Sequence, residues 1–161
     1  MKRIAWGLSA VLLSGCSLLD GWVDRGEPRR VEEISRAGNC GGSGGDAWVK
    51  AFPGPEALRA WQGQAGLFMP GMDTLHAGGY VLIGMGQRNS GGYGLAVSRE
   101  ATERDGVLRL QATFLVPSAG RMVTQMITSP CVLVRVPASG WRAVEVVDQD
   151  GLLRARGGIE G

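Results

Sequence analysis

The feature that constrains the fold most is a series of short β-strand patterns from Gly78 onward. Glycine or proline bounds most of them, so each predicts a separate short strand that ends in a turn. In the clearest pattern, at 108–116, apolar and polar residues alternate, which is typical of a strand with one buried face. The run at 80–85 is apolar throughout and predicts a central strand that is covered on both faces. Asp105-Gly106 predicts a tight hairpin turn before the alternating strand.

Further strand patterns and one helix complete the predicted domain. The other predicted strands are 31–36, 47–52, 93–99, 132–136, 143–147 and 152–156. Pro55 suits the first turn of a helix, and Gly63 and Gly66 are expected to end that helix. The chain is therefore predicted to fold as a small single domain of class α+β or mostly β, with about six to eight largely antiparallel strands and one short helix.

Composition excludes several classes of protein. The 161 residues suffice for one domain with a core, and 44% of them are hydrophobic, which argues against disorder. A single histidine and three cysteines exclude most zinc sites, and we expect neither a metal nor a cofactor. The formal net charge of +2 is too small to imply a nucleic-acid partner.

The first sixteen residues predict export. Lys2 and Arg3 precede an apolar run at 4–13, which as a helix would span only about 15 Å, too short for a hydrocarbon core of about 30 Å. The run ends in Leu-Ser-Gly-Cys at 13–16, which resembles a bacterial lipobox. Residues 1–15 are therefore predicted to be a cleaved lipoprotein signal peptide, the alternative being an ordinary signal peptide with a chance cysteine.

Lipidation of Cys16 would anchor the mature protein to a membrane, because several acyl chains, such as palmitate, bind durably. Ser17 at the second position of the mature chain resembles sorting to the outer membrane. We expect a protein that faces the periplasm from that membrane, with the cell surface as the alternative. Residues 16–30 are predicted to be a lipidated tether and residues 31–157 a globular domain. Loss of the signal leaves 15 basic and 15 acidic residues, and so no attraction to anionic partners.

Because Cys16 is predicted to carry lipid, Cys40 and Cys131 are the two cysteines of the exported chain that are left to pair, in a compartment where disulfides persist. They are predicted to form one disulfide that closes most of the domain, two buried free thiols being the alternative.

No constellation of residues supports catalysis. His76 is the only histidine and Lys50 the only lysine after the signal peptide, and no nucleophile motif such as G-x-S-x-G accompanies them. Lys50 is predicted to be exposed to solvent, and His76 to be either a surface histidine or one whose hydrogen bonds are satisfied. The spacing of the later methionines is irregular, which favours core packing over copper binding; they are Met69, Met72, Met85, Met122 and Met126. The chain is therefore not expected to be an enzyme.

The segment at 84–89 begins like a dinucleotide-binding fingerprint, but it lacks the last glycine and a following helix. A hairpin turn is the better interpretation. Such a dense glycine cluster also brings backbone N–H groups to a surface suited to binding.

Residues 78–147 resemble the C-terminal domain of the protease-complex subunit PrcB family. The matching features are an apolar strand leading into Gly86, Ser-Gly-Gly-Tyr at 90–93, a hairpin with Pro117, Val-Thr-Gln at 123–125, Thr-Ser-Pro at 128–130 and Leu-Val-Arg-Val-Pro at 133–137. The family takes its name from a lipoprotein that accompanies a surface serine protease and supports its activity or assembly. The resemblance implies a protein-binding role without catalysis.

We therefore expect a lipid-anchored, non-catalytic envelope protein that binds another protein and supports or modulates a protease complex. Its predicted binding surface consists of two neighbouring loops, with Gln87, Arg88, Asn89, Ser90, Gly91, Gly92 and Tyr93 in the first and Thr128 and Pro130 in the second. The alternative is an envelope lipoprotein that binds a small ligand or glycan in a concave, aromatic-lined pocket. A hydrolase built on His76 or Lys50 is the least favoured interpretation.

Overall fold

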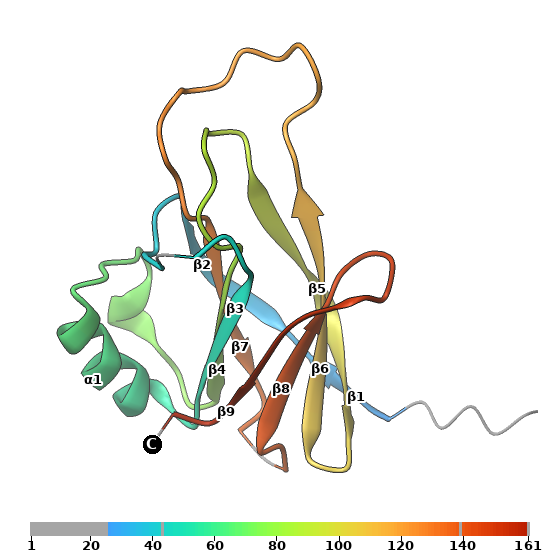
Figure 1. The fold of residues 1–161 in the computed structure, drawn as a ribbon. Coiled ribbons are helices and arrows are strands. Elements are labelled where there is room, and N and C mark those ends of the chain that lie inside the picture. Colours follow the sequence, from blue (N-terminus) through green and yellow to red (C-terminus); the bar gives the residue numbers. More distant parts are fainter. Residues whose placement is uncertain (1–25, 43, 139, 161) are drawn as a thin grey trace, which may run out of the picture.

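The computed structural model of the chain describes residues 26–42, 44–138 and 140–160. Cys16 and the expected signal peptide lie outside the described residues. Two β-sheets pack face to face, and one helix covers the outside of the smaller sheet (Figure 1). No helix in these three ranges is long and apolar enough to cross a membrane.

The larger sheet has five strands in the order β1-β5-β6-β8-β9. Their bounds are β1 Glu27–Arg30, β5 Gly94–Arg104, β6 Val107–Leu115, β8 Ala143–Val147 and β9 Leu153–Gly158. β6 and β8 are parallel, and the other neighbours in this sheet are antiparallel.

The smaller sheet has four antiparallel strands in the order β2-β7-β4-β3. Their bounds are β2 Glu32–Ala37, β7 Cys131–Val136, β4 Gly79–Gly84 and β3 Trp48–Phe52. The mostly β class with one short helix is confirmed, with nine strands in the described residues where six to eight were expected.

The main core lies between the two sheets. Alternate positions of β6 face inward, so this strand buries Leu108, Leu110, Ala112 and Phe114. Val81 and Ile83 of β4 meet them from the smaller sheet. The alternation that predicted a half-buried strand at 108–116 is therefore confirmed.

A second core lies on the outer face of the smaller sheet, where helix α1 (Pro55–Ala65) covers it. Leu58 of the helix packs there with Phe52, Tyr80 and Leu82. Because β4 contributes side chains to both cores, all six of its residues are buried, as the apolar run predicts.

Local turn chemistry explains where these elements end. Gly66 ends α1 in a left-handed conformation, and its N–H donates to the carbonyl of Gln62. Gly63, which was expected to help end the helix, lies inside it. Asp105 and Gly106 both have positive φ, 53° and 76°, so the predicted hairpin turn between β5 and β6 is confirmed.

The folded domain begins before Val31, contrary to the sequence-based boundary. Residues 27–30, assigned above to the tether, form β1 and pair with β5, where Glu27 lies opposite Glu103. The segment contains a proline and no large apolar side chain, so it carries no strand pattern. Val31 is buried where the chain crosses from the larger sheet to the smaller one.

Candidate functional site

Two loops meet at one end of the sandwich. Residues 85–93 connect β4 to β5, and residues 116–130, which we call the arch, connect β6 to β7 (Figure 1). Each loop leads from one sheet to the other. Since β4 neighbours β7 and β5 neighbours β6, both loops cross at the same end.

Hydrogen bonds hold the arch against the 85–93 loop. The N–H of Arg88 donates to the carbonyl of Thr128 (2.7 Å), and the N–H of Thr128 donates back to the carbonyl of Arg88 (2.9 Å). The Thr128 hydroxyl donates to the Ser90 carbonyl (2.8 Å), and the Gly91 N–H donates to the Thr124 carbonyl (2.8 Å). The structure therefore brings together the two loops that were singled out from the sequence.

The side chain of Arg88 links two segments of this site through hydrogen bonds. Its guanidinium donates to the carbonyls of Gly45 (2.8 Å), Gln87 (2.9 Å) and Met85 (2.6 Å), and it lies 5.8 Å from the ring centre of Tyr93. These contacts tie the segment before β3 to the loop after β4. The guanidinium that was predicted to face a partner therefore donates its hydrogen bonds to backbone carbonyls of the same chain.

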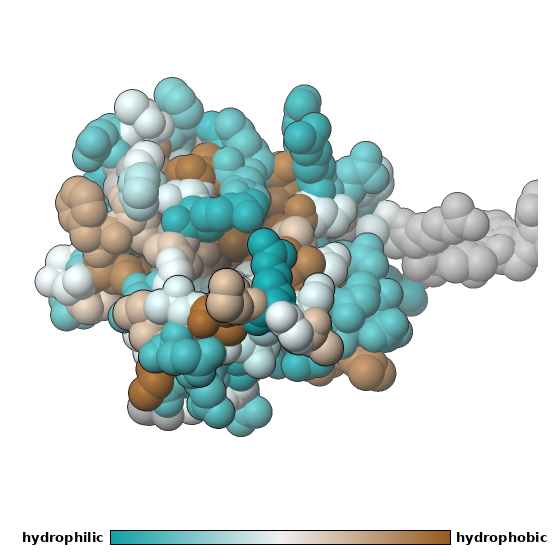
Figure 2. Space-filling view, turned by 90° about the horizontal axis from the view of Figure 1, so that it is seen from above, coloured by the Kyte–Doolittle hydropathy of each residue, from teal (hydrophilic) through white to brown (hydrophobic). Residues whose placement is uncertain are grey.

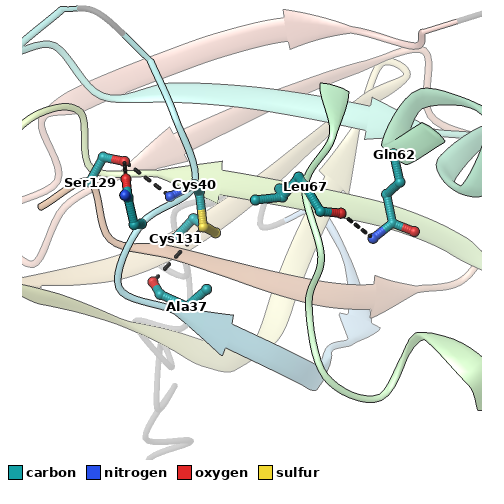
Figure 3. Close-up of a disulfide and its surroundings, with 7 residues drawn as sticks. Ala37, Cys40, Gln62, Leu67, Ser129 and Cys131 are labelled. Atoms are coloured by element: carbon teal, nitrogen blue, oxygen red, sulfur yellow. Dashed lines mark hydrogen bonds between the residues drawn. A yellow bond between two sulfur atoms is a disulfide. The ribbon is translucent and has the colours of Figure 1, made fainter. Parts of the chain in front are cut away.

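The disulfide between Cys40 and Cys131 fixes the end of the arch (Figure 3). The Cα atoms are 5.9 Å apart, and both cysteines are buried. The N–H of Cys40 donates to the backbone carbonyl (2.9 Å) and hydroxyl (3.0 Å) of Ser129, whose hydroxyl also bonds Asn39 (3.0 Å). The predicted disulfide is present, and it joins the start of β7 to the segment after β2.

Exposure divides the predicted binding residues into three groups. Gln87, Asn89 and Gly92 are exposed; Arg88, Ser90, Gly91, Tyr93 and Thr128 are half-buried. Pro130 is buried, and its carbonyl accepts a hydrogen bond from the N–H of Met85 (2.8 Å). Pro130 was wrongly assigned to the binding surface, because its place at the foot of the arch turns it inward.

The arch carries exposed apolar side chains that the sequence interpretation missed. Their exposed fractions are 69% for Val116, 97% for Met122, 58% for Met126 and 61% for Ile127. Figure 2 looks onto this end of the molecule, where hydrophobic side chains lie between hydrophilic ones. Met122 and Met126 are therefore not core residues, whereas Met69 and Met85 are.

A signal for this surface exists in the sequence. Between Pro117 and Pro130 the chain shows no strand alternation and contains a single charged residue, Arg121. The apolar side chains of this stretch have no strand pattern that would bury them, and apolar side chains exposed together mark interaction sites.

Lys50 and His76, the two residues considered for catalysis, both make contacts within the fold. Lys50 pairs with Glu160 (2.9 Å), and the carbonyl of His76 accepts the hydroxyl of Tyr80 (2.6 Å). Burial raises the pKa of Tyr80, while the nearby Arg135 acts in the opposite direction. The described residues contain no cluster of three or more His, Cys, Asp or Glu side chains that could hold a metal ion.

A cavity of about 980 Å³ lies where β1 passes into β2. It is lined by 28–33, 97–100, Val134 and Arg135, and the lining contains arginines and glutamates but no aromatic side chain. It therefore lacks the aromatic lining expected of a glycan-binding pocket.

The segment that contains both loops matches a known protein family. Residues 79–137 match the family described as PrcB C-terminal. This segment is a PrcB C-terminal domain. It runs from the first residue of β4 to the residue after β7, so it supplies two strands to each sheet and contains the whole arch. No curated protein and no solved structure matches the chain.

The resemblance seen at 78–147 is thus confirmed over 79–137, while β8 lies beyond the matched residues. The match at 79–137 points to a role associated with a protease complex.

Proposed function

We propose that the protein is a non-catalytic, lipid-anchored envelope subunit that binds a partner protein through the arch and thereby takes part in a protease complex. The observation that carries the proposal is the set of four exposed apolar side chains on a braced loop, inside the segment that defines the PrcB C-terminal domain.

The energetics of the arch support protein binding. Full burial of a Val, Ile or Met side chain contributes about 1.5–3 kcal/mol, so these four contribute roughly 4–9 kcal/mol when weighted by exposure. Association costs about 4–15 kcal/mol, part of which is the ordering of loops. The hydrogen bonds at Arg88, Thr128 and Thr124 and the disulfide reduce that part, because the ends of the arch are already fixed.

The arch also has the charge pattern of an interface centre. Its only charged residue is Arg121, and depletion of charge distinguishes the buried centre of a protein interface from the remaining surface. Methionine side chains adapt to irregular partner surfaces, and Met122 and Met126 supply two of them.

The position of the arch suits a protein held to a membrane by its N-terminus. β1 begins opposite Glu103, near the β5–β6 turn, whereas the arch leaves β6 after Leu115, which lies opposite Gly94. The eleven residues of β5 separate these two ends by roughly 35 Å. An anchor at Cys16 therefore lets the arch point away from the membrane (Figure 1).

Site-specific photocrosslinking in intact cells tests the docking surface. A photoreactive amino acid replaces Met122 in the full chain, and a second protein carries it at Gln111, an exposed position on the outer face of β6. We expect position 122 to yield an adduct with a protease or another component of its complex, and position 111 to yield none. Equal adducts at both positions, or adducts without any protease component, would contradict the proposal.

Substitution of the lipidated cysteine tests the anchor separately. The Cys16→Ala protein is expected to lose its incorporation of labelled palmitate and to leave the membrane fraction. Retention of both label and membrane association in this variant would refute lipidation at Cys16.

A further inference from the structure

The arch contains a single site for an enzyme that cuts after basic residues. Arg121 is the only Lys or Arg between Arg109 and Arg135, and its side chain is exposed. Two small residues, Ala119 and Gly120, precede it, and Met122, which follows, is almost fully exposed, so no buried side chain adjoins the bond.

The backbone around Arg121 is held weakly. Between 116 and 123, the backbone of the arch makes one turn bond, from the N–H of Arg121 to the carbonyl of Ser118 (3.2 Å), and the carbonyl of Val123 accepts an exposed bond from the side-chain amide of Gln125 (3.2 Å). The next bond is at Thr124, which accepts the Gly91 N–H. Endopeptidases bind their substrates as locally opened chain, and exposed loop tips with small residues are the usual sites of such opening.

Other basic residues of the described ranges are better protected. Most lie within strands or in α1, where cleavage requires the loss of several backbone hydrogen bonds. In the loops, Arg88 is held by three side-chain bonds to carbonyls, and the Arg142 N–H donates to Gly106 (2.7 Å) just before β8.

The structure around the arch would keep the cut protein together. The disulfide joins Cys40, on one side of the bond, to Cys131 on the other. β7 remains paired with β2 and β4, and β8 with β6, so each sheet contains strands of both fragments.

We propose that the Arg121–Met122 bond is a regulatory cleavage site for an arginine-specific endopeptidase, and that the product is a nicked, folded and disulfide-linked protein whose docking arch is inactive. Water supplies a hydroxyl to the carbonyl carbon of Arg121 and a hydrogen to the nitrogen of Met122, so one peptide bond breaks and a carboxylate and an ammonium group form. The loss of docking rests on the proposed function. It follows because two new charges arise beside the most exposed apolar side chain of the arch, and burial of unpaired charge is costly.

Limited proteolysis of the oxidised full chain with trypsin as the probe tests the site. We expect the first cut within residues 26–160 to fall after Arg121, roughly tenfold or more faster than any other. Gels without reductant should show one species, and gels with reductant two fragments. Arg121→Gln should abolish this cut, whereas Arg59→Gln, at an exposed position of α1, should leave it unchanged.

A first cut elsewhere in 26–160, an unchanged rate in Arg121→Gln, or fragments that separate without reductant would overturn the proposal. For docking, a photoreactive residue at Ile127 should give at least about tenfold less protease adduct after nicking. Undiminished adduct would overturn the inactivation alone. Absence of adduct from the intact protein would instead count against the proposed function, while the gels would still decide the cleavage site.

Discussion

Loss of the Arg88 guanidinium is expected to loosen the site from its scaffold. Arg88→Met keeps an unbranched apolar stem but removes the guanidinium and with it all the donors of the side chain. The carbonyls of Gly45, Gln87 and Met85 then lose their partners, and the segment before β3 is no longer joined to the loop after β4 through this side chain.

The structure sets the size of the effect. A hydrogen bond from a charged donor contributes about 1.5–3 kcal/mol when it is shielded from water and much less when it is exposed. The bond to Met85 is partly buried, whereas the bonds to Gly45 and Gln87 are exposed. The variant should therefore lose about 2–3 kcal/mol of unfolding free energy, which lowers Tm by roughly 6–12 °C for a domain of this size.

Urea unfolding and hydrogen exchange of the full chain measure both parts of this expectation. Arg99→Met is the matched control, because the Arg99 side chain is exposed and makes no hydrogen bond within the described residues. Exchange should rise at Gln87 and Arg88, whose N–H groups donate to Gly44 and Thr128, and remain unchanged in β8. A loss of less than about 0.5 kcal/mol, equal to that of the control, would refute the bracing role.

Two further perturbations follow from single contacts. The double variant Cys40→Ser, Cys131→Ser should lose up to about 4–5 kcal/mol in denaturant unfolding, since the disulfide closes a loop of 91 residues; an unchanged midpoint would contradict this. Burial raises the pKa of the Asp148 carboxyl. Hydrogen bonds from the N–H groups of Leu152 and Asp150 and from Arg154 lower it by more, so the pKa lies below its ordinary value. This carboxylate therefore stabilises the fold above the unfolded pKa of about 3.9, and that stability is lost as pH falls through the folded pKa. Asp148→Asn should have a lower Tm than the parent at pH 7 and a shrinking difference below about pH 4; a difference independent of pH would exclude the linkage.

Each of the eight predicted strands overlaps a strand of the structure, and for two of them the burial also follows directly from periodicity. β6 shows one buried face, and β4 shows two, so the sequence of each strand reflects its surroundings. β1 could not be found in this way, because Glu27–Arg30 lies at the edge of the larger sheet and exposes most of its side chains. Its pairing with β5 depends on backbone groups, which every non-proline residue carries.

The same limit applies to the site. Met122 and Met85 have the same side chain, yet one is almost fully exposed on the arch and the other is buried at the end of β4. Composition and spacing do not separate them; only the path of the chain does. The contacts of Arg88 were not predicted for a related reason, since its partners are the carbonyls of Gly45, Gln87 and Met85, which no motif identifies.

Glycine marks the places where this path brings segments into contact. A Cβ atom at Gly86 would lie 2.4 Å from the carbonyl oxygen of Asp46, and one at Gly92 would lie 2.8 Å from Val123 and 3.0 Å from Pro117 of the arch. Both residues also have positive φ, so a side chain is disfavoured at each position by the backbone conformation as well as by the lack of space. Gly92 thus provides the space in which the arch rests on the 85–93 loop, and Gly86 provides the space for the segment before β3. Because the arch is supported in this way at its base, its apolar side chains are directed outward, where a partner can bury them.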